Sequence, residues 1–258
     1  MFRLFKRRRE NEVVIFDKFR PPYDSSANRD AINTCELVFL CVPTPTAADG
    51  SSCDVSAVEE CVAWLTAPIC IRSTIIPGTV DRLSAATGKR LAFSPEYIGE
   101  QPGHPWHEEG ACGFLIVGGP QDLQDLVERA YRECLDSPIR FLGTTARTAE
   151  LCKYMENCFL AAKVAFVNQF YDIAAALEVD FEALRTLWLA DPRVGSSHTT
   201  VTRERGFRGR CLPKDVAALV GAMAPKGGAP LLEAVLRYNR SVCERADRAA
   251  GTNEPGAG

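Results

Sequence analysis

A single stretch, residues 148–178, constrains the fold of this chain most strongly. Its sequence, TAELCKYMENCFLAAKVAFVNQFYDIAAALE, contains neither glycine nor proline, and apolar residues occupy most sides of the helix that it would form. A helix that is apolar on most sides needs covering on several faces. We therefore predict one long, largely buried helix, and we expect two copies of the chain to pair along it as a homodimer.

The residues before this helix alternate short apolar runs with helical or loop segments. Several of these runs are apolar at every position, as strands covered on both faces are, whereas a half-solvated strand would alternate. The pattern predicts an α/β fold with a parallel, doubly wound sheet. The predicted strands are residues 13–17, 37–42, 69–73, 91–94, 114–117 and 139–142.

This change in pattern divides the chain into two predicted domains and a tail. The length of 258 residues is compatible with one to two domains at about 150 residues per domain. Residues 1–147 would form the sheet domain and residues 148–249 an all-helical domain. Residues 250–258 contain no apolar anchor and are expected to be disordered. Shorter helices are predicted at residues 181–190, 213–223 and 231–247.

Charge and hydropathy exclude several classes of partner. Thirty basic and thirty-three acidic side chains give a net charge of -3, so no overall field attracts nucleic acid or an anionic membrane. No window approaches the ~18 apolar residues that a membrane-spanning helix needs. The basic start, MFRLFKRRRE, would suit either a targeting or membrane-surface helix or a solvated helix end leading into the first strand. The second interpretation is favoured.

The cysteines and histidines show no metal-ligand spacing. The eleven cysteines contain no C-x-x-C pair, and the three histidines lie in stretches typical of loops. No export signal is recognisable, so we expect a cytoplasmic protein whose cysteines are mostly buried thiols.

The segment GFRGRCLPKDV, residues 206–216, places a cysteine at a predicted helix start. Pro213 fits the first helical position, so Cys211 would lie just outside the helix N-terminus, where orphan amides and Lys214 favour a thiolate. Asp215 could hold a water molecule or accept a proton, and the glycines would let a substrate approach the backbone. Alternatively, Cys211 is a buried loop cysteine before an ordinary capped helix.

Lys153 and Asn157 are spaced i,i+4 on the long helix, so they share one face one turn apart. A cation beside an amide donor could stabilise a developing oxyanion. Equally, the lysine could extend to solvent while the asparagine bonds a neighbouring loop.

Polar groups also follow three of the predicted strands, at the edge where doubly wound sheets bind ligands. Thr74 lies in RSTIIPGT, and SPEYIGE spaces Glu96 and Glu100 four residues apart. Turn capping and a solvated charged face are the alternatives. Asp17 ends the strand VVIFD, where an acidic residue could accept bonds from a nicotinamide cofactor's ribose.

In their order along the chain, these motifs resemble the UDP-glucose/GDP-mannose dehydrogenase family. The resemblance covers residues 12–239 and implies NAD-dependent oxidation of a sugar-nucleotide primary alcohol to a carboxylate by two hydride transfers. It rests on VVIFDKF, LVFLCVPTP, RSTIIPGT, SPEYIGE, TAELCKYMENCFLAAKVAFVNQFYD, DPRVG and GFRGRCLPKDVAAL.

The resemblance also implies roles for individual residues. Cys211 resembles the nucleophile that captures the aldehyde as a thiohemiacetal and then becomes a thioester. Lys153 and Asn157 would stabilise oxygen anions along that path. The remaining implied roles are water positioning by Asp215, Thr74 and Glu96, cofactor contacts by Asp17, Thr44, Thr74 and Glu100, and substrate contacts by Lys214 and by Arg193 across a dimer.

The sequence departs from this family's pattern at both ends. No G-x-G-x-x-G loop precedes residue 13, so the sheet would lack its first strand and its pyrophosphate-binding loop. We therefore expect Met1 to be an internal start, or the protein to be a relative with impaired NAD binding. The family's third domain, which helps to bind the nucleotide part of the substrate, has no counterpart after residue 249. We therefore expect either a smaller substrate or a second chain that supplies this part of the binding site.

Two other functions remain open from the sequence. The chain could be a catalytically silent dimerisation or scaffold protein that has lost cofactor binding. It could also be a thiol-based transferase or hydrolase that uses Cys211 without NAD.

Overall fold

The computed structural model describes residues 2–6, 12–48, 50, 52–99, 104–135 and 138–251. The chain forms two compact units, one of Met1–Pro45 and Asp54–Lys153, the other of Thr46–Cys53 and Tyr154–Gly258. The boundary after Lys153 lies inside the long helix, whereas the sequence pattern placed it at 147/148.

The first unit contains a five-stranded sheet whose strands are neighbours in chain order. The strands are β1 (Val38–Leu40), β2 (Ile69–Ile71), β3 (Leu91–Phe93), β4 (Phe114–Gly118) and β5 (Arg140–Thr144). β3 and β4 are antiparallel and the other three pairs are parallel, so the predicted all-parallel sheet is wrong at one junction. A parallel neighbour requires a crossover, usually a helix. The described part of the β3–β4 connection contains no helix.

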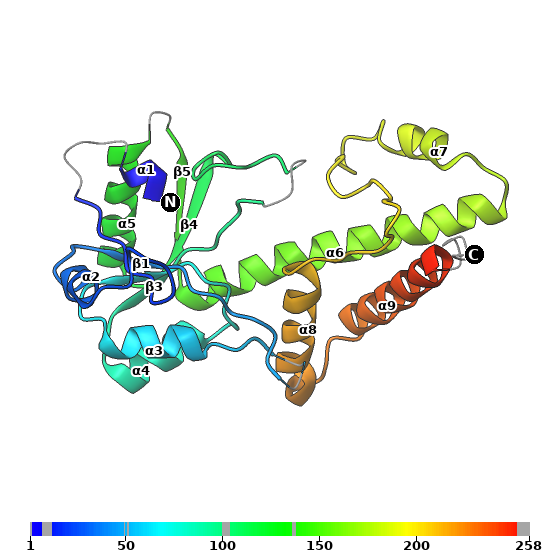
Figure 1. Cartoon of the computed structure of the whole chain (residues 1–258). Helices are drawn as coiled ribbons and strands as arrows, with labels where there is room; N and C mark the ends of the chain where they lie inside the picture. The colour runs from blue at the N-terminus through cyan, green and yellow to red at the C-terminus, as the bar shows by residue number, and fades with distance from the viewer. Residues whose placement is uncertain are drawn as a thin grey trace, which may run out of the picture. The chain divides into compact units, whose positions relative to one another are not determined.

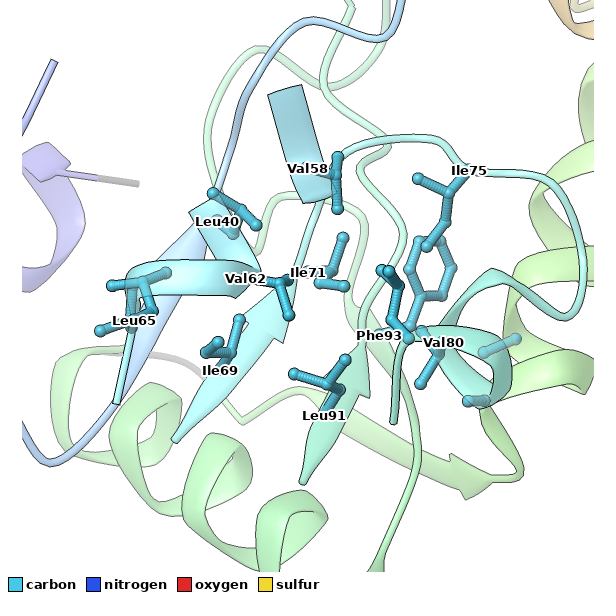
Figure 2. Close-up of a cluster of buried hydrophobic side chains, with 14 of the residues drawn as sticks. Leu40, Val58, Val62, Leu65, Ile69, Ile71, Ile75, Val80, Leu91 and Phe93 are labelled. Atoms are coloured by element: carbon cyan, nitrogen blue, oxygen red, sulfur yellow. The ribbon is translucent and has the colours of Figure 1, made fainter. Parts of the chain in front are cut away.

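Helices cover both faces of this sheet, which confirms the predicted incomplete doubly wound, Rossmann-like α/β fold. α3 (Ser56–Trp64) and α4 (Thr79–Thr87) pack on one face, and α5 (Gln121–Cys134) packs on the other (Figure 1). Ile69 and Ile71 join the cluster with α3 and α4 (Figure 2), whereas Cys70 between them joins the cluster with α5. The strand is apolar at every position because both of its faces are buried.

The N-terminal segment is not the solvated helix end that its charges suggested. α1 (Phe2–Phe5) packs against α5, and the Leu4 side chain is buried. The Phe5 ring stacks on Phe39 of β1 at 5.1 Å and meets the edge of Tyr131 at 5.3 Å. Leu4 and Phe5 therefore anchor the described part of this segment to α5 and β1.

The predicted strand at residues 13–17 does not form. These residues have no regular secondary structure, and β1 is an edge strand of the described sheet. Within the described residues nothing pairs with this segment as a strand, and an extended segment is a strand only when its backbone is paired. Residues 13–16 are half-buried, and the Phe16 ring contacts Trp64 of α3. α2 (Ser26–Ile32) follows, capped by the Ser25 side chain.

The second unit is helical, as predicted. α6 (Ala146–Ala176) begins in the first unit and continues into the second, followed by α7 (Phe181–Trp188) and α8 (Leu212–Met223). A short 3-10 helix, η1 (Ala224–Lys226), leads to α9 (Pro230–Gly251). Buried residues of α6, α8 and α9 form one apolar cluster together with Phe207. Because α9 reaches Gly251, the tail predicted to be disordered is helical at residues 250 and 251, and residues 252–258 lie outside the described residues.

α6 is not largely buried in the single chain. Large apolar side chains remain exposed along it, among them Met155, Phe159 and Leu177. We call these exposed apolar residues of α6 the α6 apolar stripe; they are Leu151, Met155, Phe159, Phe166, Phe170, Tyr171, Ile173 and Leu177. Soluble single chains rarely expose contiguous apolar patches of this kind, which commonly mark protein interfaces.

The cysteines are less buried than expected. Four of the eleven are buried, five are half-buried, and Cys41 and Cys211 are exposed. No helix within the described ranges is both long and apolar enough to span a membrane.

A buried carboxyl group of α6 holds the start of α4. Glu150 is fully buried, and its two carboxyl oxygens accept the N–H groups of Gly78 at 2.5 Å and Val80 at 2.9 Å. These amides begin α4 and have no partner within their own helix. Burial raises the pKa of Glu150 to about 7, although the two N–H groups oppose the shift. The carboxyl group of Glu150 therefore fixes the Pro-Gly turn at the end of the RSTIIPGT segment.

We expect Glu150 to make the chain less stable as pH rises through the range from its unfolded to its folded pKa. Below both values the carboxyl group is protonated in both states, and between pH 4.5 and about 7 only the unfolded state ionises, which favours unfolding. The loss amounts to about 3 kcal/mol when complete. Urea unfolding at several pH values should show a flatter profile for Glu150→Gln, and Glu244→Gln, at an exposed carboxyl group, is the control. An unchanged slope in Glu150→Gln would contradict this assignment.

Candidate functional site

Cys211 occupies the N-cap position of α8, one residue nearer to the helix than the prediction with Pro213 as first helical residue, and its side chain is exposed. Its carbonyl oxygen accepts the Asp215 N–H at 2.9 Å, which closes the first helical turn. Pro213 is the second residue of the helix, not the first. The helix start thus carries an accessible thiol, so the alternative of a buried loop cysteine is wrong.

Asp215 is the best-defined polar group near this cysteine. Its side chain is buried, and its two oxygens accept the Asn157 Nδ2 at 2.6 Å and the Lys214 Nζ at 2.5 Å. The structure therefore brings together Asn157, Lys214 and Asp215, three of the predicted residues from two helices. Each carboxylate oxygen has a second lone pair, so Asp215 retains capacity to bind water.

A second cysteine lies close to Asp215 and differs sharply from Cys211. Cys158 is buried on α6, one residue after Asn157. Burial and, to a smaller degree, the nearby Asp215 raise the pKa of the Cys158 thiol to about 12. Cys158 therefore stays protonated near neutral pH, and a thiolate nucleophile in this region must come from another cysteine.

Lys153 lies one helical turn before Asn157 on α6. Its ammonium group sits over the Tyr97 ring, 4.6 Å from the ring centroid, and Tyr97 immediately follows Glu96. An aromatic face attracts a cation, so this contact orients the lysine side chain. The predicted lysine and the SPEYIGE segment are thereby neighbours within the first unit.

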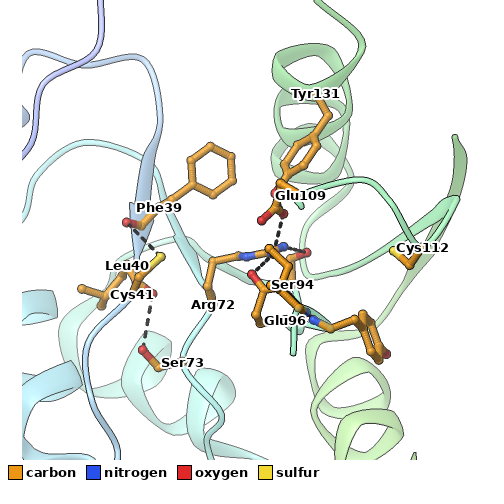
Figure 3. Close-up of polar contacts among 12 residues, drawn as sticks. Phe39, Leu40, Cys41, Arg72, Ser73, Ser94, Glu96, Glu109, Cys112 and Tyr131 are labelled. Carbon is orange, nitrogen blue, oxygen red and sulfur yellow. Dashed lines mark hydrogen bonds and ion pairs between the residues drawn. The ribbon is translucent and has the colours of Figure 1, made fainter. Parts of the chain in front are cut away.

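Glu96 belongs to a buried ionic cluster that sequence analysis missed (Figure 3). Arg72, at the end of β2, donates to Glu96 Oε2 and to Glu109 Oε1, each at 2.6 Å, and to the Ser94 hydroxyl at 2.9 Å. Tyr131 of α5 also donates its hydroxyl to Glu109. An arginine that directly follows an apolar strand was the available signal, because a buried guanidinium group needs carboxylate partners.

The two carboxyl groups of this cluster differ in pKa. Burial tends to raise the pKa of Glu96, but Arg72 and the N–H groups of Tyr97 and Ile98 lower it to below its usual range. Burial raises the pKa of Glu109 instead. Glu96 is consequently held as a carboxylate, which suits it to orienting a donor better than to taking up a proton.

Two predicted threonines meet at the carboxyl ends of β1 and β2. Thr44 is buried, and its hydroxyl donates to the Thr74 carbonyl oxygen at 2.7 Å. Ser73 beside them bonds the backbone of Val42. This is the sheet edge at which doubly wound folds bind nucleotides.

Three predicted residues are not part of these clusters. Asp17 is exposed in a turn, where it accepts the Phe19 N–H at 3.0 Å. Arg193 is 88% exposed and pairs with Asp191 at 2.5 Å. Glu100 lies outside the described residues.

The residues at the sheet edge fit part of an NAD molecule. Thr44, Thr74 and the Glu96 carboxylate offer hydrogen-bonding groups suited to hydroxyl and amide groups, and the Arg72 Nε is buried without a partner in the described part of the chain. Two carboxylates around one guanidinium group do not favour a pyrophosphate. No group of three potential metal ligands occurs among the described residues.

Comparison with known proteins identifies the family. Residues 147–241 match the UDP-glucose/GDP-mannose dehydrogenase family, central domain. The chain belongs to the UDP-glucose/GDP-mannose dehydrogenase family. The matched residues include Lys153, Asn157, Arg193, Cys211 and Asp215.

Individual relatives agree with this family. GDP-mannose 6-dehydrogenase of Pseudomonas aeruginosa is 30% identical over 241 residues, covering 84% of this chain and 54% of the relative. UDP-glucose 6-dehydrogenase of Rickettsia bellii is 28% identical over 234 residues, covering 86% and 52%. A solved UDP-glucose dehydrogenase from Pyrobaculum islandicum gives a TM-score of 0.71 at 25% identity, covering 84% and 53%. The chain spans about half the length of the curated dehydrogenases it matches.

We expect Arg72 to be essential for the stability of the first unit. Arg72→Met removes the guanidinium group that pairs with both Glu96 and Glu109, so the free energy of unfolding should fall by about 3–5 kcal/mol and the pKa of Glu96 should rise. Chemical denaturation measures the first effect. Arg82→Met, which breaks the exposed pair with Glu59, is the matched control and should cost under about 1 kcal/mol. Equal losses in the two variants would show that the buried cluster is not stabilising.

Proposed function

We propose that this chain carries the catalytic centre of an NAD-dependent dehydrogenase that oxidises a sugar-nucleotide primary alcohol to a carboxylate through Cys211. The observation that carries this proposal is the exposed thiol at the start of α8, with Asp215 of the same helix bonded to both Asn157 and Lys214. All of these residues lie within the part that matches the family's central domain. NAD, when bound, would accept a hydride at each of the two oxidation steps.

The chain's own residues would handle the carbon and oxygen atoms of the substrate. After the alcohol has lost a proton and a hydride, Cys211 Sγ forms a bond to the aldehyde carbon, and the carbonyl oxygen becomes an alkoxide. Lys153 and Asn157 would stabilise that negative oxygen. Asn157 gives one N–H to Asp215 and still has a second N–H to donate.

Hydrolysis would complete the reaction at the same carbon. Loss of the second hydride converts the thiohemiacetal into a thioester, and a water molecule then adds to its carbonyl carbon. The carbon–sulfur bond breaks, the thiolate leaves, and the product is a carboxylate. Asp215 would hold the water through its remaining lone pairs, with Glu96 and Thr74 orienting it from the sheet edge. Asp17, Thr44, Thr74 and Glu100 are the proposed NAD contacts.

We further propose a homodimer formed through the α6 apolar stripe. Burying exposed apolar side chains of this kind on a second copy stabilises association. Arg193, exposed on its loop, would then contact the substrate bound to the partner, and Lys214 would contact it from the same chain as Cys211. The loop of Arg193 is anchored by Lys163, which donates to the carbonyl oxygens of Val194 and Gly195 at 3.0 and 2.8 Å.

The same stripe supports a second candidate, a catalytically silent dimerisation protein. Under that hypothesis the helices remain a scaffold, and the first unit no longer binds NAD. NAD binding discriminates between the two candidates.

We expect NAD to raise the thermal unfolding midpoint of the purified chain, because a ligand that binds only the folded state stabilises it. With a sugar nucleotide, Cys211→Ser should then abolish formation of the acid, since serine cannot form the thioester. Acid production followed by mass spectrometry measures this, and Cys243→Ser is the control. Unchanged acid production by Cys211→Ser would reject the thioester role, and no midpoint shift at millimolar NAD would favour the silent candidate.

We expect Phe159→Glu to convert the dimer to a monomer, because it places a charge in the middle of the α6 apolar stripe. Sedimentation velocity or light scattering measures the mass. Leu231→Glu introduces the same charge at an exposed apolar residue of α9 and should leave the mass unchanged. A wild-type chain that is monomeric at micromolar concentration would overturn the dimer proposal.

A further inference from the structure

The loop that leads to Cys211 is held by the side chains of two buried asparagines. Asn239 of α9 accepts the Phe207 N–H through Oδ1 at 2.7 Å and donates its Nδ2 to the Phe207 carbonyl oxygen at 2.9 Å. Asn168 of α6 accepts the Gly206 N–H at 3.2 Å and the Arg205 Nε at 2.8 Å, both through Oδ1. Both asparagines are buried. A carboxamide thereby replaces the backbone partners that this loop would have in a strand or helix.

The backbone of the loop is strained where it is held. Arg205 and Gly206 have positive φ angles of 56° and 64°. A non-glycine residue in this region costs energy and persists only when its surroundings enforce it. Arg205 is fixed by an ion pair with Asp172 at 2.6 Å and by the Tyr171 ring, 4.5 Å from its guanidinium carbon.

Gly206 is required by this arrangement, although the sequence suggested a different reason. A Cβ atom at this position would lie 2.5 Å from Asn239 Oδ1 and 2.8 Å from Cys243 Sγ. The space beside Gly206 is therefore filled by the Asn239 side chain. The prediction that this glycine lets a substrate approach the backbone is wrong at this position. Gly209, with nothing within 4 Å of its Cβ position, keeps the open approach.

The segment from Phe207 to Cys211 is anchored at each end. Asn239 holds Phe207, and the first turn of α8 holds Cys211 through the Asp215 N–H. Between them, the Arg208 guanidinium group donates to the carbonyl oxygens of Glu204 at 2.9 Å and Cys243 at 3.2 Å, and to Asp247. A shift of the first anchor would be transmitted along four residues to the thiol.

We propose that Asn239 is a positioning residue for the nucleophile: its carboxamide, supported by Asn168, fixes the Gly206–Phe207 backbone and thereby the place of the Cys211 thiol at the start of α8. This proposal rests on the proposed function of Cys211 and adds a residue that acts through it. Asn239 acts through its two hydrogen bonds to the Phe207 backbone.

The test measures the reaction of the Cys211 thiol with iodoacetamide in the folded chain, by peptide mass spectrometry. Asn239→Ala should slow alkylation of Cys211 by at least about threefold, because a loop that is no longer held leaves the sulfur less often in its exposed place at the start of α8. Val242→Ala is the control, because Val242 is a buried residue of α9 whose side chain has no polar group to bond the loop backbone. This variant should leave the alkylation rate of Cys211 unchanged while lowering the stability of the chain. The rate of Cys152, a half-buried cysteine of α6, serves as the internal reference.

A second variant approaches the contact from the loop. Gly206→Ala should reproduce the slower alkylation, because its Cβ atom would displace Asn239. A rate for Asn239→Ala that equals or exceeds the wild-type rate would overturn the proposal, as would equal slowing by Val242→Ala. If Asn239→Ala fails to fold, Asn239→Asp replaces it, because the aspartate keeps the acceptor for the Phe207 N–H and loses only the donor. Unchanged alkylation rates in both Asn239→Asp and Gly206→Ala would then refute the proposal. The assay needs neither NAD nor a sugar nucleotide, so absence of dehydrogenase activity would reject the proposed function without affecting this result.

Discussion

The organisation of both units depends on buried polar side chains along one face of α6. Glu150, Asn157 and Asn168 are each buried, and each holds a loop or helix start that lies far away in the sequence. Glu150 bonds the amides of Gly78 and Val80, Asn157 bonds Asp215, and Asn168 bonds the Arg205–Gly206 loop. Their spacing follows the helical repeat, with Ala161 and Ala165 buried between them. Within each unit, α6 thus fixes loops or helix starts by hydrogen bonds from its buried polar side chains, while small residues allow close packing.

Charge is handled in the same way in the two candidate regions. Arg72 pairs with Glu96 and Glu109 together, and Lys214 pairs with Asp215, so each of these three carboxyl groups has a cation within hydrogen-bond distance. Breaking such a pair is costly because it leaves an uncompensated charge in a poorly solvated place. The two partners of Arg72 also differ in pKa, since burial prevails at Glu109, whereas at Glu96 the charge of Arg72 together with hydrogen bonds outweighs burial.

Local patterns in the sequence predicted the elements but not their polar partners. The five observed strands fall within or close to predicted ones, and the long helix follows from the absence of glycine and proline in residues 148–178. The strand at residues 13–17 failed because its hydrophobic pattern says nothing about whether a neighbour exists to pair with it. The role of Gly206 was misassigned because its space is filled by Asn239, a contact between residues 33 positions apart. The pairing of Arg72 with Glu109 is equally invisible to any window along the chain.

The choice of nucleophile illustrates what position adds to residue type. Cys158 and Cys211 both lie near Asp215. The Asp215 charge contributes to the raised pKa of the Cys158 thiol, and the Asp215 N–H bonds the Cys211 carbonyl oxygen in the first turn of α8. Burial fixes Cys158 as a protonated thiol whose nearest charge is negative, which opposes ionisation further. Cys211 is exposed and lies where helix amides point outward. Of these two cysteines, only Cys211 lies exposed at a helix start, where a substrate can reach its sulfur atom.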